Sequence, residues 1–158
     1  LKGTRVVFAS FDAEEAGLRV ARAWAEANLP AEVPTYAYNM DCIYTTDEAR
    51  FLSTDINGSV TMSAPLASAC SAIAAELGAT VPVMPIAFLA GGTDAAELAK
   101  RGAKATTLIA MPWSNDDRSP SYHTPDDVPA AVGLPALELA IDVGVRLAER
   151  LDSGELTV

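Results

Sequence analysis

The stretch that decides the fold reads RVVFASFDAEEAGL and spans residues 5–18. Its first half, residues 5–11, is a continuous run rich in β-branched and aromatic side chains, which is typical of a strand covered on both faces. From Ala13 to about Asn28 apolar residues recur with a helical period. The stretch therefore predicts a buried strand followed by a helix, with Glu14 and Glu15 at the junction. Ligands of α/β proteins bind at such junctions.

The adjacent acids Glu14 and Glu15 have two interpretations. Neighbouring carboxylates repel each other unless a positive charge lies beside them, and a bound metal ion with one acid as ligand and the other as proton carrier satisfies this requirement. The alternative is that both are ordinary acids of a helix N-terminus, where the helix dipole favours negative charge.

Strands and helices alternate along the rest of the chain. Further strands are predicted at residues 35–41, 51–56, 82–89 and 105–111, with an Asn57-Gly58 turn, and helices at 65–77, 94–100 and 129–151, the last bent at 133–135. This alternation predicts an α/β fold, a three-layer α/β/α sandwich around a mostly parallel mixed sheet.

Composition narrows the class of protein. At 158 residues and 50% apolar, the chain is long enough for one sizeable core. A formal net charge of −10 argues against nucleic acid or an anionic membrane as the principal partner. The two cysteines, Cys42 and Cys70, form neither a metal-binding CxxC pair nor a disulfide framework. No run approaches the roughly 20 apolar residues that span a bilayer.

Four polar features fall at the ends of predicted strands or in the loops that follow: the Glu14-Glu15 pair, Asp41, Thr93-Asp94, and the loop with His123, the only histidine. In an open parallel sheet such loops gather along one edge. Carboxylates with an imidazole suit Zn²⁺, Mn²⁺ or Co²⁺. Taken singly, Asp41 could end a strand, Asp94 could begin a helix, and His123 could be a solvated loop residue.

Four motifs in order resemble those of the co-catalytic di-zinc aminopeptidase family, which includes bacterial leucyl aminopeptidases, glutamate carboxypeptidases and glutaminyl cyclases. They read FASFDAEEAGL (residues 8–18), NMD (39–41), GTDA (92–95) and YHTPDD (122–127). The resemblance implies that Glu14 is the general base, that Glu15 and His123 bind one zinc ion, and that Asp41 binds the other. Thr93-Asp94-Ala95 replaces the Ser-Asp-His of many relatives, which leaves the role of Asp94 open.

The same family pattern places a His-x-Asp motif and a metal-bridging Asp upstream of the Glu-Glu pair, and this chain has neither. Three metal ligands are fewer than two zinc ions require. We therefore expect residues 1–158 to be the C-terminal part of a single zinc-peptidase-like catalytic domain whose N-terminal part is missing, with little zinc affinity or activity alone. The alternative is a natural short relative that kept the fold and lost catalysis.

The resulting functional hypothesis is a zinc-dependent exopeptidase of aminopeptidase type, with a peptide as substrate. Alternatives are a non-catalytic binding or scaffold domain of the same fold and a glutaminyl cyclase-like transferase. Phe51, Trp113 and Tyr122 are candidates for the wall of a side-chain pocket, with ordinary packing as the alternative. The resemblance suggests export from the cytoplasm, with a cytoplasmic protein as the alternative, and the sequence does not define an oligomeric state.

Overall fold

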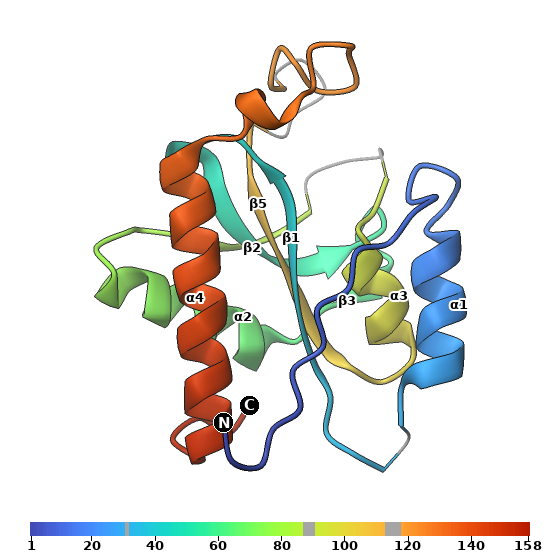
Figure 1. Ribbon diagram of the computed structural model, residues 1–158, viewed down its shortest axis with the longest axis vertical. Helices are drawn as coiled ribbons and strands as arrows, with labels where there is room; N and C mark the ends of the chain where they lie inside the picture. Colours follow the sequence, from blue (N-terminus) through green and yellow to red (C-terminus); the bar gives the residue numbers. More distant parts are fainter. Residues whose placement is uncertain (31, 87–90, 113–117) are drawn as a thin grey trace.

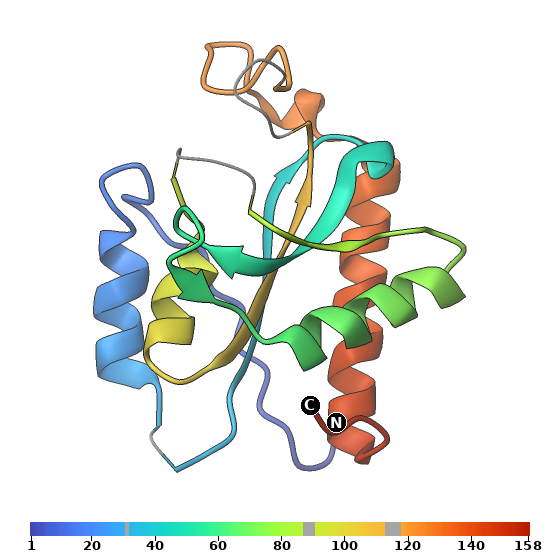
Figure 2. The same cartoon turned by 180° about the vertical axis from the view of Figure 1, so that it is seen from behind.

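The computed structural model describes residues 1–30, 32–86, 91–112 and 118–158, which form helices on both faces of a central sheet (Figures 1 and 2). The strands are β1 (Tyr36–Ile43), β2 (Ala49–Asp55), β3 (Val60–Thr61), β4 (Val83–Pro85) and β5 (Lys104–Ala110). The helices are α1 (Arg19–Asn28), α2 (Ala64–Glu76), α3 (Asp94–Lys100) and α4 (Leu134–Ser153), with short 3₁₀ turns η1 (Thr46–Glu48) and η2 (Pro129–Ala131).

The sheet is mixed and has the order β1-β5-β2-β3, with β4 on the other edge of β2. Within the described ranges, the β1–β5 and β2–β4 pairs are parallel, whereas β2–β5 and β2–β3 are antiparallel. The β2–β3 hairpin turns at Asn57-Gly58, as predicted, where both residues have positive φ. Of the strand predicted at 82–89, β4 forms residues 83–85, and residues 87–89 lie outside the described part of the chain.

Helices α2 and α4 cover one face of the sheet, and α3, with α1 outside it, covers the other (Figure 1). The main core lies beneath α2 and α4, where Phe51 and Leu108 from the sheet pack against Leu66 and Val143. The three-layer α/β/α sandwich predicted from the sequence is confirmed. Nowhere in the described part of the chain is a helix both long enough and apolar enough to cross a membrane.

The strand predicted at residues 5–11 is wrong for this structure. Residues 5–10 are exposed and irregular, and the Phe8 side chain is 96% accessible. Only Phe11 is partly buried, with its ring 5.7 Å from that of Trp24 in α1. An apolar run becomes a strand only when a neighbouring strand takes up its backbone hydrogen bonds. None of the described strands pairs with these residues.

Two helix boundaries also differ from the prediction. Helix α1 begins at Arg19 instead of Ala13, because Ala13, Gly17 and Leu18 have positive φ and cannot continue a right-handed helix. Helix α4 begins at Leu134, after η2 and the non-helical Gly133, so residues 129–151 are not one bent helix.

Candidate active site

Glu14 and Glu15 lie in a tight turn before α1. The carbonyl oxygen of Glu14 accepts hydrogen bonds from the backbone N–H groups of Gly17, at 2.9 Å, and Leu18, at 2.8 Å. No acid lies in the first turn of α1 itself. The alternative that this pair serves the dipole of a helix N-terminus is therefore wrong, and the turn leaves both carboxylates available for another role.

Asp41 lies near the end of β1, opposite Ile109 of β5. A bulge follows directly, because the register shifts between Asp41 and Ile43 and Cys42 adopts a φ of 53°. The Cys42 thiol donates a hydrogen bond to Asp41 Oδ1 at 3.1 Å. A bulge changes the direction of side chains at the end of a strand, and here it directs both Asp41 and Cys42 to one pocket.

His123 reaches the same place from the loop between β5 and α4. Its Nε2 is 2.6 Å from Glu15 Oε1, although the two residues are far apart in sequence. Its ring stacks on that of Tyr122, with centroids 3.8 Å apart and planes 18° apart. Its φ of 59° is unusual for a non-glycine residue. The His123 side chain is half exposed, but its contact with Glu15 makes it more than a solvated loop residue.

A pocket of about 270 Å³ collects these side chains. Its lining combines all four predicted site residues with five others, namely Glu14, Glu15, Asp41, His123, Cys42, Gly91, Gly92, Arg118 and Tyr122. The structure thus brings together the four residues that the resemblance assigned to the site, whereas Thr93 and Asp94, the remaining polar feature, do not line the pocket. It does so at the end of the sheet where the parallel strands β1 and β5 terminate (Figure 1).

The charges at this pocket are mostly negative. Burial, followed by the charges of Glu15 and Asp41, raises the pKa of Glu14 to about 7. Burial also raises the pKa of Asp41. Burial and the charges of Asp41 and Asp55 raise the pKa of Asp94 to about 6. Carboxylates gathered in this way favour protonation or a bound cation.

Asp94 is not among the residues that line the pocket. It is the first residue of α3, as the simpler interpretation predicted, and the preceding Gly91 and Gly92 line the pocket in its place. Its Oδ1 is nevertheless buried, and within the described residues it has no hydrogen-bond partner.

The carboxylate and imidazole groups of the pocket are of the type that binds zinc, but among the described residues too few of them lie close together to hold an ion. Carboxylate and imidazole groups are ordinary zinc ligands, and the Glu15–His123 contact shows that two of them meet. Across residues 1–30, 32–86, 91–112 and 118–158, however, no three His, Cys, Asp or Glu side chains come close enough together to hold a metal ion.

The sequence did not single out Cys42, Arg118 or Asp55. Cys42 gave no signal because a lone cysteine next to a strand end is usually packing. Asp55 gives no signal either, because an acid just before a turn such as Asn57-Gly58 is ordinary. Of the three aromatic candidates, Tyr122 lines the pocket, Phe51 is wholly buried in the core, and Trp113 lies outside the described residues.

A larger and more open hollow of about 610 Å³ lies where η1 and the start of α4 meet the end of α2. Its polar lining includes Asp47, Glu138 and Asp142. It contains no imidazole or thiol, and it brings together no nucleophile and base, so the smaller pocket is the better candidate for chemistry.

Comparison with known proteins agrees with this geometry. The model of a family described as peptidase family M28 matches residues 2–146. Among solved structures, the zinc aminopeptidase BSAP from Bacillus subtilis has a TM-score of 0.69 at 19% identity, over 90% of this chain and 34% of that chain. An aminopeptidase from Aneurinibacillus sp. strain AM-1 has a TM-score of 0.62 at 20% identity, over 87% and 31%.

A third structure, the PhTET1-12s dodecamer, has a TM-score of 0.56 at 22% identity, over 85% of this chain and 38% of that chain. The chain therefore spans about a third of the length of the solved structures it matches. No curated protein sequence matches it.

Proposed function

The chain belongs to peptidase family M28, and from this we propose that it supplies part of the catalytic domain of a zinc-dependent aminopeptidase, which removes N-terminal residues from peptides. The observation that carries the proposal is the convergence of Glu14, Glu15, Asp41 and His123 on one pocket, from three separate segments. The zinc aminopeptidase from Bacillus subtilis shares the fold and supports the choice of metal and reaction.

Glu15 and His123 would hold one zinc ion and Asp41 a second, with the remaining ligands supplied from outside residues 1–158. When bound, zinc lowers the pKa of a coordinated water and polarises a carbonyl group. The cluster of acids supports this assignment, because a cation between them would offset both the burial and the charge repulsion that raise the pKa of Glu14 and Asp41.

Glu14 is assigned the role of general base. Its carboxylate takes a proton from the attacking water and passes it to the leaving nitrogen. The nitrogen therefore leaves as a neutral amine and not as an amide anion. Burial disfavours its charged form and so makes the carboxylate a stronger base than one in water. Glu15 cannot take this role while it is paired with His123.

Replacement of Glu14 tests the assignment. In the full-length protein, Glu14→Gln is expected to lower kcat for an aminoacyl reporter substrate by at least about 100-fold while zinc content stays unchanged, because only the proton carrier is lost. Glu149→Gln, the same change at an exposed site on α4, is the control and is expected to keep full activity. Unchanged kcat in Glu14→Gln would refute the role.

A second candidate is a non-catalytic binding domain on the same fold. The shortfall of metal ligands among the described residues is the observation that favours it. Zinc content below one ion per full-length molecule, together with no hydrolysis of any aminoacyl reporter by the unmodified protein, would establish this alternative.

A further inference from the structure

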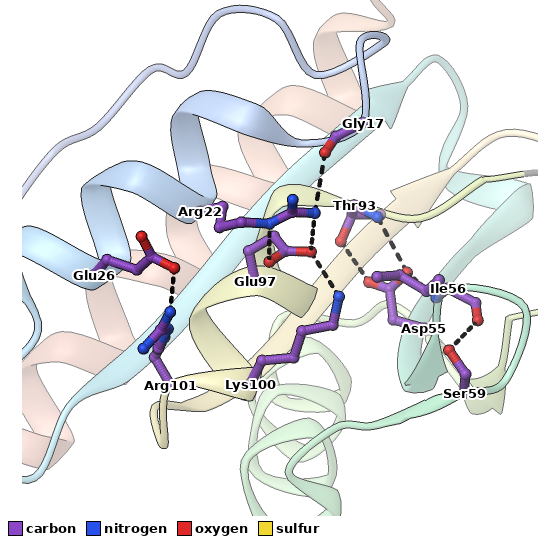
Figure 3. A network of polar contacts seen from close by, with 10 residues as sticks. All are labelled: Gly17, Arg22, Glu26, Asp55, Ile56, Ser59, Thr93, Glu97, Lys100 and Arg101. Carbon is purple, nitrogen blue, oxygen red and sulfur yellow. Dashed lines mark hydrogen bonds and ion pairs between the residues drawn. The ribbon is translucent and has the colours of Figure 1, made fainter.

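A buried carboxylate outside the candidate site lies directly behind the pocket wall. Asp55, at the end of β2, is fully buried, and its oxygens accept three hydrogen bonds (Figure 3). The backbone N–H groups of Ile56 and Thr93 donate to Oδ1 at 2.7 and 3.0 Å, and the Thr93 hydroxyl donates to Oδ2 at 2.6 Å. Two of these bonds hold the residue that connects Gly91-Gly92 to α3.

The hydrogen bonds continue from Thr93 into the sheet. The hydroxyl groups of Thr93 and Thr107 lie 2.7 Å apart, and both residues are buried. The single hydroxyl proton of Thr93 is directed at Asp55, so the Thr107 hydroxyl donates to Thr93. Asn39 of β1 in turn donates to Thr107 in a longer contact of 3.4 Å. We call Asn39, Thr107, Thr93 and Asp55 the relay.

The relay connects two walls of the candidate site. Asn39 is two residues before Asp41 on β1, so their side chains lie on the same face of the strand. At the other end, Gly92 packs closely on the β2 turn, since a Cβ atom there would lie 2.5 Å from Ile56 Cγ1 and 3.2 Å from Asp55 Oδ1. The relay therefore spans the distance from the strand of Asp41 to the glycines of the pocket wall.

We infer that the four residues of the relay, Asp55 included, are positioning residues of the candidate active site. They fix the Gly91–Asp94 segment relative to Asp41 without touching the substrate. The inference rests on the proposed function for its kinetic consequence. A buried carboxylate with three donors holds a backbone segment more firmly than neutral turn contacts do. Displacement of a pocket wall by a fraction of an ångström impairs the alignment of a bound substrate with the base.

Thr93→Val tests the inference in the full-length protein, because valine keeps the branched shape of threonine and has a methyl group in place of the hydroxyl. In Thr93→Val we expect kcat at 25 °C to fall about 10- to 100-fold while KM changes less than about threefold. In Thr93→Ser, which keeps the hydroxyl, we expect kcat to stay within about threefold of that of the unmodified protein. Ser59→Ala is the matched control. It removes a 2.7 Å hydrogen bond to the Ile56 carbonyl in the same turn but leaves the relay intact (Figure 3).

Amide hydrogen exchange of residues 91–94 is the second readout, and it is independent of activity. It should accelerate in Thr93→Val and remain unchanged in Thr93→Ser and Ser59→Ala. Loss of thermal stability in Thr93→Val with unchanged kcat and unchanged exchange would reduce the relay to a structural role and overturn the inference. If Thr93→Val does not fold, Thr107→Val interrupts the relay one bond further from the pocket.

An inactive unmodified protein would refute the proposed function and leave the exchange result to decide the relay. Accelerated exchange of residues 91–94 in Thr93→Val alone would then still support its positioning role. Equal exchange in Thr93→Val and Ser59→Ala would overturn it.

Discussion

Gly133 fixes the start of α4 against the end of β1. A Cβ atom at this position would stand 2.0 Å from the carbonyl oxygen of Tyr44, and the Gly133 N–H donates to the Ile43 carbonyl at 3.3 Å. Both contacts are with backbone, which cannot move aside as a side chain can. Gly144, inside α4, is different, because a Cβ atom there would meet only the Tyr38 ring, at 3.1 Å.

Gly133→Ala is therefore expected to lower the free energy of unfolding by about 1–3 kcal/mol, the usual cost of overpacking. In Gly144→Ala the crowding of the Tyr38 ring is offset by the better helix propensity of alanine, worth about 0.5–1 kcal/mol, so a change below about 1 kcal/mol is expected. Urea denaturation measures both, and equal losses in the two variants would contradict the backbone clash.

The positions of the site residues were predictable because each follows a strand of the predicted sheet. The rule that such ends share an edge held for Asp41 and His123, which follow β1 and β5, whereas Glu14 and Glu15 reach the same pocket although the strand predicted before them is absent. Their chemical roles stay predictions. Asp55 could not be recognised, because its partner Thr93 lies 38 positions away and no local pattern records that contact.

Helices α1 and α3, on one face of the sheet, are joined by charged contacts. Glu97 of α3 is only 4% exposed at its side chain, and it accepts hydrogen bonds from Arg22 Nε of α1 at 3.0 Å and from Lys100 Nζ at 2.6 Å (Figure 3). Arg22 also donates to the carbonyl oxygen of Gly17, at 3.4 Å, in the turn that carries Glu14. A second pair, Arg101 with Glu26, links the same helices at the surface.

Glu97→Gln is expected to lower the free energy of unfolding by about 1–3 kcal/mol, because it removes the charge that both cations face in a buried position. Glu26→Gln breaks the exposed pair, in which both side chains are about half accessible, and should cost less than about 1 kcal/mol. Chemical denaturation of the two variants compares them directly. A Glu26→Gln loss as large as that of Glu97→Gln would show that burial does not govern the contact.

Elements whose ends are marked by capping residues or whose apolar pattern is clear were predicted well. Helix α2 has Ser63 as N-cap, whose hydroxyl accepts from the Leu66 N–H, and Gly78 follows its end with positive φ. Strand β5 is buried almost throughout, as its apolar run required. The run at residues 5–11 failed because composition records how apolar a strand is but not whether a partner is present.

At the scale of the whole molecule, the two ends of the chain lie together (Figure 1). The carboxylate of Asp152, near the end of α4, accepts hydrogen bonds from the backbone N–H groups of Lys2, Gly3 and Thr4 at 2.6–2.8 Å. Hydrogen bonds from Gly3 and Lys2 lower the pKa of Asp152 to about 2. These hydrogen bonds, between residues about 150 positions apart, join the first residues of the chain to the end of α4.

This contact predicts a pH dependence of stability. A carboxylate whose pKa is lower in the folded than in the unfolded state stabilises the fold above its unfolded pKa, near 4, and loses that contribution as the pH falls toward 2. Asp152→Asn should therefore be less stable than the unmodified protein at pH 5, with a difference that shrinks between pH 4 and 2.

Urea midpoints across that range provide the measurement, with Asp142→Asn, at an exposed position on α4, as the control. A difference between Asp152→Asn and the unmodified protein that is independent of pH would contradict the assignment.

The exposed run at residues 5–10 has a consequence for the acid pair. Within the described residues, the turn of Glu14 and Glu15 is held by α1, through the Phe11–Trp24 ring contact and the Arg22–Gly17 hydrogen bond, and by the contact of Glu15 with His123. The other approach to the turn is a stretch of chain with no sheet partner. A strand that paired with residues 5–10 would hold the turn from this second side as well and restrict the position of Glu14, the proposed general base.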